Sequence, residues 1–376
     1  MVEKLSGVKS AEKYEKNINI GIFGSHSAEE VGVSAKAAGL QTILICEKGR
    51  EQLYTRYNKH LFDEIVVLDK FDMLLDEEIQ NQLVERNTIF IPNRSFSVYL
   101  GWKNIENKFF VPIYGNKFML KIEERGIERD QYWLLKRAGI RTPKEFKTPE
   151  EIDCLAVVKV QQKNNPLERA FFYPDTPEDF YKKANKMLKE GIISGEGLKK
   201  AKIEEFVVGP RFNANFQAYA LEDVFGKFDF VGFDDRIQTN IGGVLKLPAQ
   251  EQLNLKIQMK NEEIGHFGVT MRESKKPLVY EAAEKFCAAA KEEFPPGMVG
   301  LFALQGAVPY GEGEKPEFVV FDVSPRVPGC PCVGPTSPEM RRLSLKYKKS
   351  IESPIDLCMM EINYAVENGL LSKVVT

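Results

Sequence analysis

Short apolar runs, separated by polar or helical stretches, occupy the first third of the chain. Residues 18–23 read INIGIF, and runs of the same kind follow at 41–46, 64–69, 88–93 and 110–115. Strands that are buried on both faces of a sheet read as nearly continuous apolar segments. Residues 17–116 are therefore predicted to form a parallel sheet with helices on its faces. Ligands of such sheets bind beyond the carboxyl ends of the strands.

The residues after the first apolar run, Gly24 to His26, stand where a strand meets a helix. Ser27 and Glu30 have the spacing of a capping box, which predicts that a helix begins here. Backbone N–H groups at the start of a helix suit an anion such as a phosphate monoester, and His26 can add a donor. An ordinary turn with an exposed histidine explains the same residues equally well. Residues 92–95, Pro-Asn-Arg-Ser, offer similar chemistry at the end of a later strand.

The rest of the chain mixes helical and alternating patterns. A charged stretch at 117–139 predicts a helix, a hairpin is expected at 157–173, and Thr176 is expected to cap a helix that reaches about Glu190. Further strands are expected at 202–209, 212–220, 227–234, 242–248, 300–308 and 317–326, and further helices at 277–294 and 355–371. This layout predicts an α/β region followed by an α+β region, with domains at 1–120, 121–210 and 211–376.

The composition narrows the class of protein. Of the 376 residues, 43% are hydrophobic and 28% are charged, as in an ordinary soluble globular protein. The net charge of −2 gives no basic excess, which argues against nucleic-acid and membrane partners. A polar N-terminus and the lack of a long apolar run predict a cytoplasmic protein. The six cysteines are scattered and read as reduced thiols, and the count of three histidines argues against a multi-histidine metal centre.

Lys159 lies inside an apolar strand that leads into the segment QQKNNPLER. A strand lysine beside a loop can hold a phosphate, and ATP would be the anionic partner that a buried lysine needs. Glu204, Glu205, Phe206 and Val207 resemble the hinge strand of ATP-grasp enzymes, which offers backbone groups to adenine. Phosphate loops are normally rich in glycine, however, and this segment has none. A strand lysine that simply reaches water is the competing interpretation.

Gln305 and Asp322 end two apolar strands with oxygen-bearing side chains. Mg²⁺ prefers oxygen ligands, so one amide oxygen, one carboxylate and the phosphates of ATP would suffice to bind it. Arg326 follows on the second strand and could hold a γ-phosphate or an acyl phosphate. By spacing alone, solvated strand ends with a salt bridge are the simpler explanation.

Several longer stretches resemble one family. The matching segments, in chain order, are GSHS (24–27), KGR (48–50), PNRSF (92–96), VPIYGNK (111–117), KRAGIRTP (136–143), IEEFVVG (203–209), LPAQEQL (247–253), MRES (271–274), PPGMVG (295–300) and VVFDVSPR (319–326). On these residues the chain resembles, from about Ile18 to Thr376, the archaeal formate-dependent FAICAR synthetases of purine biosynthesis, which belong to the ATP-grasp superfamily. The resemblance implies an α/β and α+β chain with an ATP-grasp fold and an N-terminal Rossmann-like (pre-ATP-grasp) domain.

The resemblance also implies a reaction. ATP phosphorylates formate to formyl phosphate, and the amine of AICAR, an aminoimidazole carboxamide ribonucleotide, attacks it to give FAICAR, ADP and phosphate. The family uses Mg²⁺, with Mn²⁺ as an alternative ion, and tends to form homo-oligomers. The residues carried over are His26, Ser95 and His266 for AICAR; Lys159, Glu204, Glu205, Phe206, Val207 and Gln238 for ATP; Gln305 and Asp322 for the metal; and Lys159 and Arg326 for catalysis.

The sequence departs from the family pattern at the implied nucleotide site. Residues 161–169 contain no glycine where the family has a glycine-rich loop, and Gln238 stands where a carboxylate is expected. His266 replaces an asparagine, and Asp322 replaces a glutamate. Two alternatives therefore stay open. One is a catalytically altered or inactive ATP-grasp paralogue that binds a ribonucleotide or a partner subunit, and the other is a ligase for another pair of amine and carboxylate.

Overall fold

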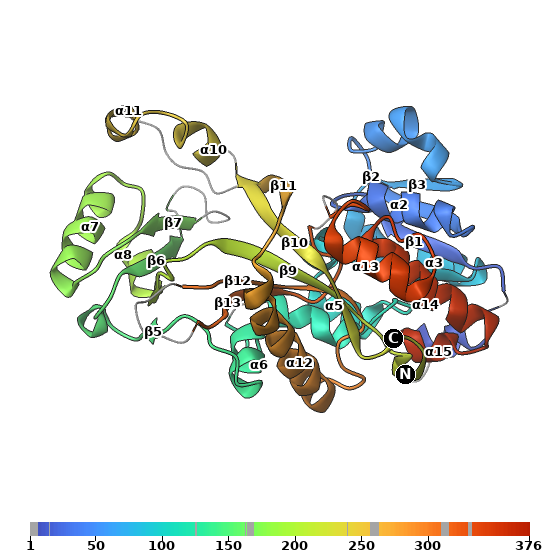
Figure 1. The fold of residues 1–376 in the computed structure, drawn as a ribbon. Helices are drawn as coiled ribbons and strands as arrows, with labels where there is room; N and C mark the ends of the chain where they lie inside the picture. The colour runs from blue at the N-terminus through green and yellow to red at the C-terminus, as the bar shows by residue number, and fades with distance from the viewer. Residues whose placement is uncertain are drawn as a thin grey trace. The chain divides into compact units, whose positions relative to one another are not determined.

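The computed structural model describes residues 7–14, 16–124, 126–161, 163, 169–238, 240–255, 263–309, 316–329 and 333–376 (Figure 1). The chain divides into two compact units. The first unit comprises Met1–Gly139, Phe212–Gln305 and Asp322–Thr376, and the second comprises Ile140–Arg211 and Gly306–Phe321. The division of the sequence into three domains stays a prediction. Among the described residues, no helix combines the length and the apolar character that crossing a membrane requires.

The first unit begins with a four-stranded sheet in the order β3-β2-β1-β4. Its strands are β1 (Asn19–Phe23), β2 (Gln41–Glu47), β3 (Glu64–Leu68) and β4 (Thr88–Ile91), and every pairing is parallel, which confirms the prediction for this region. Ile22 of β1 lies opposite Leu44 and Ile91, and all three are buried because both faces of the sheet are covered. The helices of this part are α1 (Gly7–Ala11), α2 (Ala28–Ala37), α3 (Glu77–Glu85), α4 (Arg94–Leu100) and α5 (Trp102–Lys108), with short 3₁₀ or π turns at Leu53–Tyr57, Lys59–Leu61 and Phe71–Leu75.

The capping box expected at the start of α2 is wrong. Ser27 precedes the helix with φ 65°, in the left-handed region, and its side chain makes no cap hydrogen bond. Its Oγ instead lies 2.9 Å from Nδ1 of His26. Glu30 accepts a hydrogen bond from Ser353 Oγ at 2.8 Å. The side chain of Ser27 therefore bonds to the adjacent residue, and that of Glu30 bonds to a distant segment, instead of capping the helix.

The strand expected at 110–115 is also not formed within the described chain. Ile113 makes an isolated parallel bridge with Phe90, and Tyr114 makes an antiparallel bridge with Val375. Pro112 lies inside this segment and has no N–H to donate, although its carbonyl accepts from the backbone of Phe90 at 2.7 Å. The segment consequently lies beside β4 without extending the ladder.

The helix expected at 117–139 is broken. Lys117–Glu123 forms a 3₁₀ helix, and α6 (Gln131–Arg137) forms separately. Gly126 between them has φ +82°, which no continuous helix contains. The strand expected at 242–248 is likewise wrong, because α10 (Ile241–Val244) occupies its first half.

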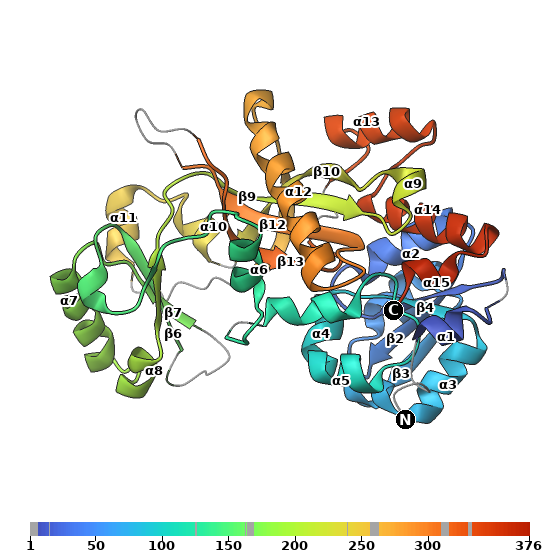
Figure 2. The same ribbon diagram turned by 90° about the horizontal axis from the view of Figure 1, so that it is seen from below.

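The second sheet of the first unit has five strands in the order β11-β10-β9-β12-β13. These are β9 (Arg211–Ala218), β10 (Phe228–Gln238), β11 (Glu263–Val269), β12 (Gly300–Ala307) and β13 (Val319–Ser324); the last residues of β12 and the first of β13 belong to the second unit. β10 pairs antiparallel with β9 and with β11, as the alternating pattern predicts for the first pair. Helix α12 (Lys276–Glu293) lies beside this sheet (Figures 1 and 2). Phe286 of α12 stacks on Phe302 of β12, with ring centroids 5.4 Å apart.

The remaining helices of the first unit lie between the strands of this sheet or after them in the sequence. They are α9 (Glu222–Phe225), α11 (Ala249–Asn254), a 3₁₀ turn at Glu273–Lys275, α13 (Pro338–Tyr347), α14 (Pro354–Glu367) and α15 (Leu371–Val374). The helix expected at 277–294 is confirmed as α12, whereas the helix expected at 355–371 forms as α14 and ends at Glu367, before a separate α15. Val279, Ala282, Phe286 and Ala290 of α12 are buried, as the 3.6-residue period of the sequence predicts.

The second unit is built on a four-stranded sheet in the order β5-β8-β6-β7. Its elements are β5 (Glu145–Phe146), β6 (Ala156–Gln161), β7 (Arg169–Phe172), β8 (Lys202–Glu205), α7 (Pro177–Lys189), α8 (Gly195–Lys199) and a 3₁₀ turn at Pro149–Glu151. β6 and β7 form the predicted antiparallel hairpin, and Thr176 caps α7 by accepting from the backbone N–H of Asp179 at 3.2 Å. Most of the glycine-free segment 161–169 lies outside the described residues, so its role as a phosphate loop stays a prediction.

Candidate functional site

The loops after β1 and β4 lie beside each other at the carboxyl end of the parallel sheet. Nδ2 of Asn93 donates to the main-chain oxygens of Phe23 at 3.2 Å and His26 at 2.7 Å. Ser95 Oγ donates to Ser25 Oγ at 2.7 Å. The structure therefore brings the segments of His26 and Ser95, two of the residues predicted for AICAR, to one place.

Glu263 joins His26 to His266. Nε2 of His26 lies 3.5 Å from Oε1 of Glu263, and Nε2 of His266 lies 2.7 Å from the same oxygen. The centroids of the two imidazole rings are 6.3 Å apart, with the ring planes nearly perpendicular. All three residues predicted for AICAR thus lie around one region of the first unit, with Ser95 reaching it through Ser25.

His266 has a carboxylate beside each of its two ring nitrogens. Asp234 Oδ2 lies 2.5 Å from Nδ1 of His266, and Asn213 and Asn215 donate to the same carboxylate at 2.7 and 2.6 Å. Burial disfavours a charged imidazole, but the bonds to Asp234 and Glu263 outweigh it and raise the pKa of His266 to about 9. His266 thus lies between two carboxylates, and both of them favour the protonated imidazole.

Glu263 is in turn a stabilised anion. Burial by itself would raise its pKa, yet the hydrogen bonds from His26 and His266 and the charge of Arg236 hold the pKa of Glu263 well below its usual range. Arg236 Nε lies 3.1 Å from the second oxygen, Oε2. The Glu263 carboxylate thus has one oxygen toward the two imidazoles and the other toward a guanidinium.

A chain of side chains continues from Arg236 to the predicted metal residues. Arg236 donates from Nη2 to Oε1 of Gln305, and Gln305 Nε2 donates to Ser324 Oγ at 3.2 Å. Asp322 Oδ1 accepts from Nε2 of Gln131 at 2.9 Å, while Oε1 of Gln131 accepts from the backbone of Val323 at 2.6 Å. Gln305 and Asp322 therefore lie on neighbouring strands with their oxygens held by hydrogen-bond donors.

Arg326 is buried and bound to a carboxylate. Its guanidinium donates to both oxygens of Glu123, at 2.8 and 3.3 Å, and to the carbonyl of Val327 at 2.9 Å. Arg94 reaches the same carboxylate at 3.3 Å. Bidentate pairing of this kind suits phosphate as well as carboxylate. Because Glu123 already pairs with the guanidinium, Arg326 can bind a phosphoryl group only if that group replaces Glu123 or shares the guanidinium with it.

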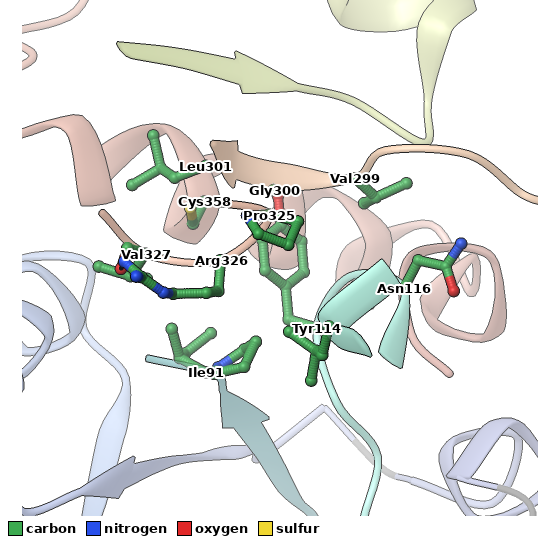
Figure 3. A pocket seen from close by; sticks show the side chains of 12 residues that line it. Ile91, Tyr114, Asn116, Val299, Gly300, Leu301, Pro325, Arg326, Val327 and Cys358 are labelled. Atoms are coloured by element: carbon green, nitrogen blue, oxygen red, sulfur yellow. Dashed lines mark hydrogen bonds between the residues drawn. The ribbon is translucent and has the colours of Figure 1, made fainter. Parts of the chain in front are cut away.

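A small, mostly apolar pocket lies beside Arg326 (Figure 3). Its lining consists of Ile91, Pro92, Tyr114, Asn116, Leu120, Val299, Gly300, Leu301, Pro325, Arg326, Val327 and Cys358. The polar groups on its wall are already engaged: Tyr114 donates to Glu361 at 2.6 Å, and Asn116 Nδ2 donates to the carbonyls of Phe294 and Gly297 at 2.7 and 2.9 Å. The pocket is thus a feature of the packing between β4 and β12 rather than a convergence of reactive groups.

In the second unit, Lys159 is paired with Glu204. Lys159 donates from Nζ to Glu204, whose other oxygen lies 3.0 Å from Lys202 Nζ. Burial would raise the pKa of Glu204, but the two lysines outweigh that effect and lower it. The strand lysine therefore does not simply reach water, because it lies partly buried against a carboxylate.

The other predicted hinge residues of the second unit are held by specific contacts. Glu205 accepts from Arg141 Nη2 at 3.1 Å and from the backbone N–H of Lys144 at 3.0 Å. Phe206 meets Tyr173 edge to face, with ring centroids 5.2 Å apart, and Arg211 covers it at 4.8 Å. Val207 is buried in an apolar cluster with Ala307 and Val319. These contacts hold residues 205–207 in place within the second unit.

Gln238 ends β10 opposite Glu263 in the register of the sheet. It lies in the first unit, whereas the other residues predicted for ATP, Lys159 and 204–207, lie in the second. The roles of all these residues stay predictions.

Four charged residues at these places carry no role in the sequence-based prediction: Glu123, Asp234, Arg236 and Glu263. Glu263 and His266 are three positions apart, a spacing that puts side chains on opposite faces of a regular strand. A β-bulge between Ile237 and Gln238 shifts the register of β10 and β11, which lets both side chains reach one side. A bulge of this kind leaves no sign in the pattern of apolar residues.

Solved structures share this fold. The chain superposes on the IMP biosynthesis protein PurP of Thermococcus kodakaraensis with a TM-score of 0.67 and 21% identity, covering 95% of this chain and 100% of that one. The N5-carboxyaminoimidazole synthetase of Staphylococcus aureus complexed with ADP gives a TM-score of 0.55 and 13% identity, covering 94% and 79%. The parallel N-terminal sheet and these likenesses show that the chain has the ATP-grasp fold.

Sequence comparison then identifies the family. Residues 20–146 match "Protein of unknown function (DUF1246)" and residues 179–376 match "Domain of unknown function (DUF1297)". The 5-formaminoimidazole-4-carboxamide-1-(beta)-D-ribofuranosyl 5'-monophosphate synthetase of Methanocaldococcus jannaschii is 38% identical over 331 residues, 88% of each chain. The enzyme of the same name from Methanopyrus kandleri is 35% identical over 362 residues, 96% of each chain. The chain belongs to the family of these synthetases.

Proposed function

We propose that this protein is an ATP- and Mg²⁺-dependent carbon–nitrogen ligase that formylates AICAR with formate to give FAICAR. The observation that carries the proposal is the similarity to synthetases of that name along 88% of both chains. The retained residues His26, Ser95 and Lys159, with the metal residues Gln305 and Asp322, support it.

The chemistry needs two displacements. An oxygen of formate attacks the γ-phosphorus of ATP, the bond to the ADP oxygen breaks, and formyl phosphate forms. The amine nitrogen of AICAR then attacks the formyl carbon, phosphate leaves and the nitrogen loses a proton. No residue of the enzyme has to form a covalent bond, so positioning and charge neutralisation are the tasks of the side chains.

The residues of the chain divide these tasks. Lys159, beside Glu204 and Lys202, supplies positive charge for the phosphates of ATP, and the backbone of residues 204–207 contacts adenine. Arg326 neutralises the transferred phosphoryl group after exchange with Glu123. His26 and Ser95 contact AICAR from the loops after β1 and β4, and His266 contacts it from β11.

Gln305 and Asp322 fit a magnesium ion by their chemistry. Both offer oxygen, the ligand that Mg²⁺ prefers, and they lie on the adjacent strands β12 and β13. The amide oxygen of Gln305 accepts from Arg236 and keeps a second lone pair for a ligand bond. A bound Mg²⁺, or Mn²⁺ in its place, would neutralise charge on the phosphates during transfer. From family membership we also propose self-association and a cytoplasmic location, and the three-part domain division stays a prediction.

The test begins with calorimetric titration of Mg-ATP into the purified protein, with and without AICAR. We expect Mg²⁺-dependent binding of ATP, and release of ADP only when formate and AICAR are both present. Binding of AICAR without binding of ATP would contradict the ligase proposal and favour a nucleotide-binding paralogue. ADP release that depends on a different amine or carboxylate would favour a ligase of other specificity, for which His266 in place of asparagine is the specific sign.

A matched pair of variants links the activity to the metal residues. Asp322→Asn is expected to lower ADP release by about 100-fold or more, because the transition state loses a charge-stabilising ligand. Asp72→Asn removes the same charge at an exposed position on the 3₁₀ turn Phe71–Leu75 and should leave the rate unchanged. Equal rates in both variants would contradict the role of Asp322.

A further inference from the structure

Three side chains of the first unit form a group with the chemistry of a transition-metal site. They are His26, Glu263 and His266, and one potential ligand atom from each lies within 4.8 Å of the other two. Below, this group is called the His-Glu-His cluster. Its members come from the loop after β1 and from the edge strand β11, so the tertiary fold assembles it.

Each histidine of the cluster is oriented by a partner on its other nitrogen. Nδ1 of His266 lies 2.5 Å from Asp234, and Nδ1 of His26 lies 2.9 Å from Ser27 Oγ. Both Nε2 atoms are thereby turned toward Oε1 of Glu263. Histidines that bind metals are held in this manner, by a carboxylate or another polar partner on the second nitrogen, which fixes the tautomer and the ring orientation.

The carboxylate of Glu263 is held as well. Arg236 lies 3.1 Å from Oε2, which leaves Oε1 as the oxygen that faces the imidazoles. The side chain of Glu263 is 29% exposed and that of His26 is 32% exposed, whereas His266 is 6% exposed. A small ion can therefore reach the cluster from solvent, while one ligand and its partner lie in the interior.

The spacing of the ligand atoms in the cluster is close to that of a metal site. A Cβ placed on Gly329 would overlap Nε2 of His266, so the backbone of Gly329 packs directly against this end of the imidazole and only glycine fits there. In a tetrahedral site with ligand distances of about 2.0–2.1 Å, neighbouring ligand atoms lie about 3.3 Å apart. The observed separations from Glu263 Oε1 are 2.7 Å to His266 and 3.5 Å to His26. Small side-chain movements would thus convert the hydrogen-bonded cluster into a ligand set.

We propose that the His-Glu-His cluster binds one divalent transition-metal ion, with Zn²⁺ as the ion of choice. Two imidazoles and one carboxylate suit Zn²⁺, and three protein ligands leave a fourth position for water or for an oxygen of a bound molecule. This site differs from the predicted Mg²⁺ site at Gln305 and Asp322, which offers only oxygen. It shares His26 and His266 with the residues proposed for AICAR, but it is tested without AICAR and does not depend on the ligase activity.

The small number of histidines in the sequence argues against a metal centre with several histidines, but the positions of these histidines in the fold favour one. Two of the three share one carboxylate, and the third, His60, lies exposed on the 3₁₀ turn Lys59–Leu61. His60 provides a natural control, because a histidine-to-asparagine change there removes the same group at an exposed position outside the proposed ligand set.

The test uses the full chain after removal of metals with a chelator, without ATP, AICAR or formate. Titration with Zn²⁺ is expected to give one bound ion per chain. His266→Asn and His26→Asn are each expected to weaken binding by at least about 100-fold, since loss of an outer partner alone costs up to that factor. His60→Asn should bind Zn²⁺ like the parent. Circular dichroism of every variant checks that the fold is retained.

Co²⁺ supplies a second, spectroscopic measurement. Bound in place of Zn²⁺, it should give the intense visible absorption of a tetrahedral site, and His266→Asn should remove that absorption. A sulfur-to-cobalt charge-transfer band would instead assign the ion to cysteine and overturn the proposal. Unchanged binding in both cluster variants, or no binding to the parent chain, would overturn it equally and would leave a hydrogen-bonded ion pair as the role of the cluster. Neither result bears on ATP binding, so the ligase proposal is tested separately.

Discussion

Glu30 on α2 is a buried carboxylate with an incomplete set of partners. Ser353 Oγ donates to its Oε1 at 2.8 Å, but its Oε2 is buried and has no hydrogen-bond partner within the described chain. Burial raises the pKa of Glu30 to about 7; the bond from Ser353 lowers it somewhat, and the nearby Asp356 raises it further. At neutral and alkaline pH the folded protein therefore contains a carboxylate that the unfolded chain hydrates better.

The sign of the effect on stability follows from that pKa. Between the ordinary glutamate pKa of 4.5 and about 7, the folded state binds the proton of Glu30 more tightly than the unfolded state does, so the free energy of unfolding falls as the pH rises through this range. Glu30→Gln is expected to raise the free energy of unfolding by about 1–2 kcal/mol at about pH 8. The gain should vanish at about pH 4, where the parent carboxyl is protonated in both states.

Denaturant unfolding at the two pH values measures this difference. Glu29→Gln is the matched control, because Glu29 is the exposed neighbour on the same helix and loses the same charge. A gain of equal size at both pH values would mean that the charge of Glu30 is not the cause, and a loss at about pH 8 would contradict the argument.

Ser27 and Glu30 also show the limit of prediction from local sequence. Ser27 and Glu30 have the spacing of a capping box, yet the side chain of Ser27 meets the adjacent His26 and that of Glu30 meets Ser353, a partner that its neighbours in sequence do not reveal. His26 and His266 were predicted for one substrate and do lie together. Glu263, which joins them, could not be predicted, because the bulge that turns it toward His266 depends on the pairing of β10 with β11.

At the scale of elements, local signals suffice where the element's own residues supply its boundary. Helix α7 illustrates this, since Thr176 provides the cap, Pro177 occupies the first turn and Glu178 and Asp179 complement the positive end. Phe180 and Ala184 then anchor the helix in the core of the second unit. Sequence and structure agree here residue by residue.

Thr176→Ala is therefore expected to destabilise the second unit by about 1 kcal/mol, because the backbone N–H of Asp179 loses its acceptor. Thr176→Ser retains the hydroxyl oxygen and should restore most of that loss. Urea unfolding followed by circular dichroism compares the two variants. Equal stability of the alanine and serine variants would show that packing of the threonine methyl, rather than the cap, sets the effect.

Elements whose boundaries depend on distant segments were predicted less well. The run at 110–115 has the composition of a strand, but Pro112 has no donor for a continuing ladder, and the segment meets Phe90 and Val375 through single bridges. The charged stretch at 117–139 has a helical composition, yet Gly126 adopts a positive φ that ends the first turn early. Composition indicates what a segment favours, and tertiary contacts decide how much of it forms.

At the scale of the whole molecule, the chain contains separate apolar cores. One cluster of the first unit includes Ile20 and Leu44, whereas that of the second unit includes Val158 and Ile193. Order in the sequence does not predict this division, because the second unit combines residues 140–211 with 306–321. The first unit likewise consists of three segments, and the pattern of apolar runs does not reveal that they share one core.

Separate cores predict that heat unfolds the protein in more than one transition, since chains of several domains depart from two-state behaviour. Ile20→Ala and Ile193→Ala are a matched pair, each removing the same atoms from a side chain that is at most 1% exposed. Each should destabilise its own unit by about 2–5 kcal/mol. Differential scanning calorimetry should then show Ile20→Ala lowering one transition and Ile193→Ala lowering the other. If both variants instead lower a single shared transition by the same amount, the two units fold as one cooperative body, and the separation of their cores does not govern stability.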